Sequence, residues 1–86
     1  MPEEEVSRDL QLEIVRFGAR ARVWAFLRLN PGRFFTPEEI AEATRLSPRT
    51  VRDSLLFLRR LPRIEVRITY EDGKKTVRYG FKSLIA

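Results

Sequence analysis

Apolar residues recur at intervals of three and four between residues 8 and 29, and this spacing predicts one long helix. Ser7 is placed to cap the start of this helix, and Asp9 adds negative charge in its first turn. Asn30-Pro31-Gly32 predicts its end, because Pro and Gly both interrupt helices. The apolar residues form two stripes on nearly opposite sides, Leu10, Ile14, Phe17, Ala21 and Trp24 in the first and Leu12, Val15, Ala19, Val23 and Phe26 in the second.

A helix at the surface of a domain buries one apolar stripe against the core. A helix that is apolar on two opposite sides must pack against other protein on both sides. A chain of 86 residues has little further protein to cover the second side. We therefore expect a partner, most simply a second copy of the chain. The expected dimer interface is the first stripe: Leu10, Ile14, Phe17, Ala21 and Trp24. The alternative is a central helix that its own domain wraps on all sides.

The next segment predicts a short strand and a short helix. Phe34-Phe35 is apolar and aromatic, which indicates a brief strand or a core-filling segment. Thr36 as N-cap, Pro37 at the first helical position and Glu39 at the third form a capping-box pattern. The helix is expected to end near Thr44, with Ile40, Ala41 and Ala43 on its buried side.

A second cap-and-proline pair predicts the following helix after a turn at Arg45-Leu46. Ser47-Pro48 opens this helix, which is expected to run to about Arg60 before Leu61-Pro62. One face carries apolar residues at spacings of four and three: Val51, Leu55 and Leu58.

The end of the chain predicts two strands joined by a tight turn. Apolar and polar residues alternate over 64–70 and again over 76–81, and Asp72-Gly73 between them is a strong signal for a two-residue hairpin. The register that this loop sets pairs apolar residues on one side: Ile68 with Val77, Val66 with Tyr79 and Ile64 with Phe81. The same register places Arg67 opposite Arg78 on the polar side.

Charge and composition narrow the classes of function. The net charge is +5, but residues 1–44 sum to −2 and residues 45–86 to +7, which indicates a polyanionic partner. The chain has no Cys and no His, so the usual nucleophiles, bases and zinc ligands are missing, and we expect no enzyme activity, no metal and no cofactor. No apolar run approaches membrane length and the N-terminus is acidic, so a cytoplasmic location is expected.

Three stretches together resemble the winged helix-turn-helix family, as in MarR-like and ArsR-like bacterial and archaeal regulators. The residues that carry the resemblance are Thr36-Pro37-Glu38-Glu39-Ile40-Ala41, then Leu46-Ser47-Pro48-Arg49-Thr50-Val51, then Leu55 and Leu58, followed by the hairpin. The resemblance covers residues 22–82 and implies an α+β fold with a three-helix core and a C-terminal β-hairpin wing. The chain is then a single domain, 1–86, in which residues 1–21 extend the long N-terminal helix and serve in dimerisation.

The resemblance implies sequence-specific binding of duplex DNA by a transcription regulator. Residues 48–60 form the recognition helix that enters the major groove, and residues 63–81 form a wing on the DNA backbone. The expected DNA-binding residues are Ser47, Pro48, Arg49, Thr50, Arg52, Asp53, Leu56, Arg60, Arg67, Lys74, Lys75 and Arg78. Arg49 and Arg52 are the candidates for reading guanine, and Lys74 and Lys75 for backbone contacts at the hairpin tip. No small-molecule effector is expected.

Three features depart from the simplest interpretation or leave alternatives open. Arg67 and Arg78 repel each other unless a phosphate lies against them or Glu65 and Glu71 neutralise them. Leu56 and Phe57 stand where the family usually carries polar residues, and Leu61-Pro62-Arg63 replaces its usual Gly before the wing. The alternative function is therefore a winged-helix protein-protein interaction module of a transcription or replication assembly.

Overall fold

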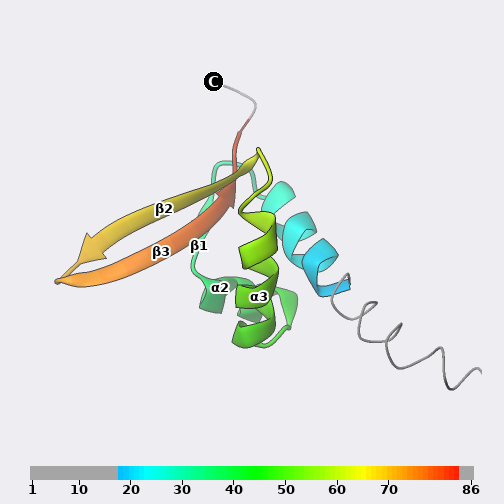
Figure 1. Cartoon of the computed structure of the whole chain (residues 1–86), viewed down its shortest axis with the longest axis horizontal. Helices are drawn as coiled ribbons and strands as arrows, with labels where there is room; N and C mark the ends of the chain where they lie inside the picture. Colours follow the sequence, from blue (N-terminus) through cyan, green and yellow to red (C-terminus); the bar gives the residue numbers. More distant parts are fainter. Residues whose placement is uncertain (1–17, 84–86) are drawn as a thin grey trace, which may run out of the picture.

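The structure is a computed structural model that describes residues 18–83. Its elements in chain order are a helix over 18–28, β1 (Phe34–Phe35), α2 (Pro37–Thr44), α3 (Pro48–Leu58), β2 (Ile64–Glu71) and β3 (Lys74–Phe81) (Figure 1). Three helices and a three-stranded antiparallel sheet make up the described part, so the expected α+β class is confirmed. The element order is compatible with the expected winged helix.

Helix 18–28 is the described part of the expected long helix, and the expectation for residues 8–17 lies outside the described residues. Its end at Asn30-Pro31-Gly32 is confirmed. The Asn30 side-chain amide donates to the Phe26 carbonyl at 2.7 Å, and Gly32 takes a positive φ of 80° that reverses the chain toward β1.

The caps of α2 and α3 follow the sequence prediction. In α2 the Glu39 N–H donates to Thr36 Oγ1 at 3.2 Å, and the Thr36 N–H donates to the Glu39 carboxylate at 2.8 Å, which completes the capping box. In α3 the Thr50 N–H donates to Ser47 Oγ at 3.1 Å. Arg45 adopts a left-handed conformation between the two helices, with φ of 59°, which turns the chain from α2 into α3.

One predicted core residue of α2 is wrong. Ala43 is exposed, and Thr44 takes the buried position next to it. The helix crosses α3 on the face that carries Ile40, Ala41 and Thr44. The Thr44 hydroxyl donates to the Ile40 carbonyl at 2.6 Å, and this bond allows a polar side chain to be buried there.

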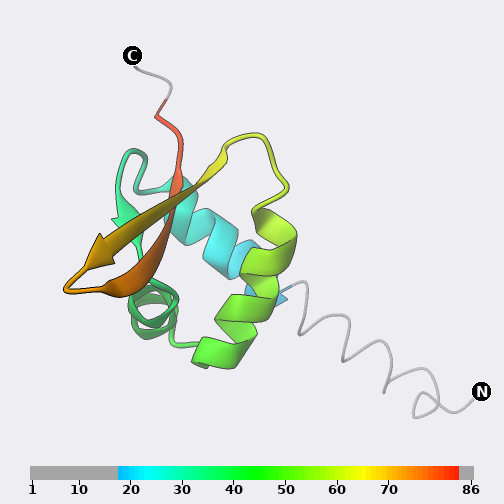
Figure 2. The same ribbon diagram turned by 60° about the vertical axis from the view of Figure 1, so that its left-hand side comes forward.

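The core lies where helix 18–28, α2, α3 and the base of the sheet meet (Figure 2). Its five largest fully buried side chains are Val23, Leu27, Ile40, Val51 and Leu55. The predicted α3 face of Val51, Leu55 and Leu58 is thereby confirmed as buried. In helix 18–28 the core-facing side is the second stripe, with Ala19 and Val23, together with Leu27, which the sequence analysis assigned to neither stripe.

The sheet has the strand order β1-β3-β2, and its β2–β3 register is the predicted one. Ile64 pairs with Phe81, Val66 with Tyr79 and Ile68 with Val77. The short β1 reaches only the end of β3, where Phe34 pairs with Gly80 and Phe35 with Tyr79. The rest of the hairpin therefore projects away from the helices, as both ribbon views show (Figures 1 and 2).

The projection leaves part of the apolar side of the hairpin uncovered. Ile64 at the base is buried, whereas Val66, Ile68 and Tyr70 are 38%, 52% and 73% exposed in turn toward the tip. Residues 18–83 include no helix with the length and apolarity that crossing a membrane requires.

Candidate nucleic-acid interface

The outward side of α3 carries one stripe of exposed residues. Arg49, Asp53 and Leu56, with Arg60 in the turn that follows, repeat at intervals of four, three and four. They lie opposite the buried positions of the helix. These four of the expected DNA-binding residues therefore share one side, about three helical turns long.

Capping uses much of the hydrogen-bonding capacity at the start of α3. The Ser47 hydroxyl donates to Thr50 Oγ1 at 2.8 Å while it accepts from the Thr50 N–H. Pro48 has no N–H to offer. The Arg49 N–H is left without an intrahelical acceptor, so Arg49 combines a backbone donor and a guanidinium at this end of the helix.

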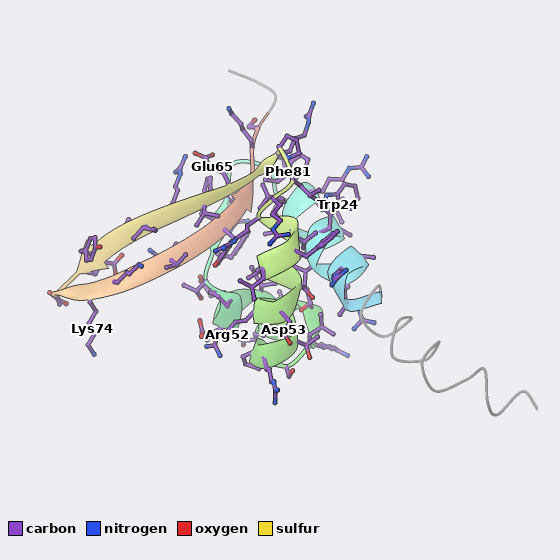
Figure 3. The ribbon with its side chains drawn as sticks, viewed as in Figure 1. Trp24, Arg52, Asp53, Glu65, Lys74 and Phe81 are labelled. Atoms are coloured by element: carbon purple, nitrogen blue, oxygen red, sulfur yellow. The ribbon has the colours of Figure 1, made fainter. Side chains whose placement is uncertain are left out.

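Arg52 lies on the flank of α3 that faces α2, and its guanidinium pairs with the Glu38 carboxylate (Figure 3). This ion pair joins side chains of two helices that are 14 positions apart in the chain, and it was not predicted because it depends on how the helices pack. Both side chains are more than half exposed, so the pair contributes little to stability. It does hold Arg52 toward α2, away from the stripe of Arg49 and Asp53.

The two exposed apolar residues near the end of α3, Leu56 and Phe57, lie in different surroundings. Leu56 is 55% exposed and belongs to the outward stripe. Phe57 faces helix 18–28, and the Arg20 guanidinium covers its ring at 4.3 Å from the centroid. Leu56 is therefore the apolar side chain that a partner on the outward side of α3 meets.

Arg67 and Arg78 are direct neighbours across the hairpin, as the register predicted. Each has its own acidic partner, with Arg67 Nε 3.9 Å from a Glu65 oxygen and the Arg78 guanidinium 3.3 Å from a Glu71 oxygen. Arg67 also lies 3.8 Å above the Phe34 ring centroid. Of the two explanations considered for this pair, neutralisation by Glu65 and Glu71 is the one that the geometry supports.

Lys74 and Lys75 lie at the hairpin tip, and both are exposed. Asp72 and Gly73 form the two-residue turn, with positive φ values of 51° and 75°. Figure 3 shows Lys74 at the far end of the hairpin, with its side chain directed toward the side on which α2 and the start of α3 lie. Neither lysine pairs with an acidic residue within the described part of the chain.

The expected dimer interface is described only at its end. Leu10, Ile14 and Phe17 lie outside the described residues, and Ala21 is exposed. Trp24 is half-buried against the core of its own chain, where its ring meets the edge of Phe81 at a centroid distance of 6.5 Å (Figure 3). Part of the Trp24 surface is therefore covered without a partner.

The charges within α2, α3 and the β2–β3 hairpin, as the structure bounds them, nearly cancel, whereas the wider expected ranges 48–60 and 63–81 carry +5 because they include Arg59, Arg60 and Arg63. Residues 36–58 carry three basic and four acidic side chains, and residues 64–81 carry four basic and three acidic ones. The +7 of the C-terminal half is therefore not concentrated on α3 and the hairpin. Much of it lies in the residues between and after them, of which only Arg60 was predicted as a site residue.

No cluster of three metal-ligating side chains occurs within residues 18–83. Comparisons with models of known families, with curated proteins and with solved structures find no match to this chain.

Proposed function

We propose that this chain is a winged helix-turn-helix protein that binds duplex DNA and regulates transcription, with α3 in the major groove and the β2–β3 hairpin as the wing. Support comes from the order of elements and from the capped, closely crossing α2–α3 pair. The three-stranded sheet that ends in a projecting hairpin gives the same support.

The outward stripe of α3 carries this proposal. Arg49 suits bidentate contact with guanine, Asp53 suits the amino group of cytosine, and Leu56 suits the methyl group of thymine. Arg49 is exposed and pairs with no acidic residue in the described part of the chain. Its guanidinium is therefore available to DNA without breaking an existing ion pair.

The hairpin supplies backbone contacts in this proposal. Four acidic residues of α2 and the hairpin are already engaged, since Glu38 pairs with Arg52, Glu39 caps α2, and Glu65 and Glu71 pair with Arg67 and Arg78. The tip lysines are not engaged in this way. Lys74 and Lys75 are therefore the cations of the wing that phosphates attract most directly.

The test begins with selection of bound sequences from a random duplex pool. We expect Arg49→Ala to lose about 1–3 kcal/mol of discrimination at the base pair that Arg49 contacts. Lys74→Gln with Lys75→Gln should weaken binding equally on all sequences and lower the salt slope by about 1 per lysine. Arg63→Ala removes the same charge as Arg49→Ala away from the outward stripe, so it is the matched control and should leave the sequence preference unchanged.

Two outcomes contradict parts of this proposal. If Arg49→Ala weakens all sequences equally, as the lysine variant does, α3 does not read bases through Arg49. If the wild-type protein binds no duplex at 50 mM salt, or its affinity does not change between about 50 and 200 mM salt, the DNA-binding proposal fails.

A protein partner is the second candidate, and the uncovered apolar side of the hairpin favours it. Val66, Ile68 and Tyr70 form a row of exposed apolar side chains that a DNA backbone does not need. Leu56 adds a further exposed apolar side chain on α3. In this candidate the chain is an interaction module of a transcription or replication assembly, and sequence selection from the duplex pool yields no enriched site.

A further inference from the structure

Three separate segments of the chain meet at the end of the molecule opposite the start of α3. They are the end of helix 18–28 with the turn that follows it, the loop between α3 and β2, and the residues after β3, and both ribbon views place them together (Figures 1 and 2). Backbone hydrogen bonds join them, with the Lys82 N–H donating to the Arg63 carbonyl at 2.8 Å and the Gly32 N–H donating to the Phe81 carbonyl at 2.9 Å.

These segments carry basic side chains and no acidic ones. We name this surface the basic end; its exposed residues are Arg28, Arg33, Arg59, Arg60, Arg63 and Lys82. Residues 18–83 carry 15 basic and 7 acidic side chains, a net charge of +8, so the basic end accounts for six of these eight charges. The two elements of the proposed DNA-reading site, α3 and the β2–β3 hairpin, sum to +2, so most of the net positive charge lies at the basic end, which shares Arg60 with the outward stripe of α3.

Two of these arginines are held over aromatic rings. The Arg28 guanidinium lies 5.0 Å from the Trp24 centroid, and that of Arg33 lies 5.7 Å from the Phe35 centroid. Such stacking limits the freedom of the guanidinium and leaves its N–H donors at the surface. Arg63 and Lys82 form no ion pair with a described residue.

We propose that the basic end binds the phosphate backbone of a second DNA duplex, so that one molecule joins two duplexes. This inference rests on the proposed function, in which α3 and the hairpin tip hold the first duplex. The start of α3 lies at one end of the domain, and the turn after helix 18–28, the loop after α3 and the end of β3 lie at the other (Figure 2). A duplex docked at the start of α3 therefore leaves these three segments uncovered.

The chemistry of the basic end favours a phosphate backbone over a membrane or an acidic protein. Five of its six cations are Arg, whose planar guanidinium fits phosphate oxygens in a bidentate manner. The nearby rings of Trp24 and Phe35 lie under guanidinium groups and belong to the side chains packed against the core, so they are not offered for insertion into lipid. Leu29 is the one large exposed apolar side chain recorded among 28–33, 59–63 and 82–83.

A capture experiment tests this inference with the full chain. One duplex with the selected sequence is immobilised, a second duplex of random sequence carries a fluorophore, and the protein is added at 50 mM salt. We expect the wild-type protein to retain the fluorescent duplex. The variant Arg33→Gln/Arg63→Gln/Lys82→Gln should retain at least tenfold less, while its affinity and sequence preference for the immobilised duplex persist.

Two further variants serve as controls. Arg33→Lys/Arg63→Lys preserves the charge and should retain the second duplex, since phosphate attraction depends chiefly on charge. Arg63→Gln/Lys82→Gln leaves the Arg33–Phe35 contact intact, so it tests the basic end even if the triple variant folds poorly. Each phosphate contact that is removed should also lower the salt slope of second-duplex capture by about 0.9.

The outcomes separate this inference from the proposed function. If capture of the second duplex is the same in the triple variant, two DNA-reading faces of a homodimer join the duplexes and the inference is wrong. If the wild-type protein binds one duplex and captures no second one, the inference fails and the proposed function stands. If it instead binds vesicles with 30% phosphatidylserine through these residues and captures no second duplex, the basic end is a membrane surface. If it binds no duplex at all, both proposals fail.

Discussion

Gly80 occupies a position in β3 that no larger residue fits. A Cβ atom built there lies 2.5 Å from the Arg33 carbonyl oxygen and 2.7 Å from the Phe34 ring. The missing side chain allows the Phe34 ring to lie over the strand, and Arg67 in turn lies on that ring. One glycine therefore sets the place of an aromatic ring and of a basic side chain on the polar side of the sheet.

We expect Gly80→Ala to destabilise the protein by about 1–3 kcal/mol, because the added carbon meets backbone as well as the ring and forces both to move. Urea unfolding measures this change. Gly18→Ala is the matched control, since Gly18 lies in helix 18–28 with nothing within 4 Å of the added carbon. It should stabilise the helix by up to about 1 kcal/mol. Equal effects of the two substitutions would contradict the packing described at Gly80.

Glu39 ties the stability of α2 to pH. The hydrogen bond from the Thr36 backbone N–H lowers the pKa of this carboxyl below its ordinary value of 4.5, slight desolvation opposes the shift, and the Thr36 hydroxyl and Arg78 lower the pKa further. A pKa that is lower in the folded state than in the unfolded state stabilises the fold above the unfolded value. This contribution is lost as the pH falls through the folded pKa.

We therefore expect the free energy of unfolding to fall as the pH drops from 6 to 3, in part through Glu39. Glu39→Gln keeps an oxygen that accepts from the Thr36 N–H but does not titrate, so its stability should change less over the same range. Urea unfolding at several pH values compares the two proteins. Glu42→Gln, on an exposed position of the same helix, is the control and should keep the pH dependence of the wild type. If Glu39→Gln keeps it as well, the Glu39 carboxylate does not contribute.

At the scale of elements, the sequence predicted those whose signals are local. The caps of α2 and α3 and the Asp72-Gly73 turn depend on residues within four positions of each other, and each is confirmed. The hairpin register was also predicted correctly, because one side of both strands is apolar and a slip by one residue would mix the two sides.

Burial within the helices and contacts between helices were predicted less completely than these local features. Ala43 was expected to be buried because it is apolar, whereas Thr44, four residues after Ile40, takes the buried position and bonds its hydroxyl to the Ile40 carbonyl. Leu27 was assigned to neither apolar stripe of its helix, although it lies four residues after Val23 and continues the second stripe, and it is fully buried. The pairing of Arg52 with Glu38 and the place of Arg20 over Phe57 follow from packing between helices.

The apolar side of the hairpin shows where a correct register was not sufficient. The paired residues share one side as predicted, yet burial declines from Ile64 at the base to Tyr70 near the tip. Alternation identifies the side that is apolar, but the length of β1 and the size of the helical layer decide how much of that side is covered. The candidate site was limited in the same way. Its residues were named one by one from the sequence, but the sequence did not show which of them lie on the outward side of α3, on its flank or on the hairpin.

At the scale of the whole molecule, the +7 charge of the C-terminal half is divided unevenly among its elements. α3 and the β2–β3 hairpin each carry +1, whereas the loop after α3 and the residue after β3 carry +4 through Arg59, Arg60, Arg63 and Lys82. A sum over half the chain loses this division because the loops that carry the excess alternate with nearly neutral elements. The fold brings three such loops together, and only then does their common charge form a surface.

The proposed dimer belongs to the same scale, and it leads to a test by truncation. The described core residues all lie between Ala19 and Ile64, so a chain that starts at Gly18 keeps every one of them. We expect this shortened chain to unfold cooperatively and to sediment as a monomer. The full chain should sediment as a dimer, because Leu10, Ile14 and Phe17 complete the first apolar stripe.

Sedimentation of both chains over a range of concentrations, with circular dichroism to confirm folding, makes this comparison. Leu10→Lys/Ile14→Lys in the full chain is the companion variant, since it disrupts the stripe without shortening the helix. It should shift the full chain toward monomer. A full chain that remains monomeric at high concentration would contradict the argument that two apolar sides require a partner. A shortened chain that still dimerises would instead place the interface on the described surface, where the uncovered hairpin residues Val66, Ile68 and Tyr70 offer the largest run of exposed apolar side chains.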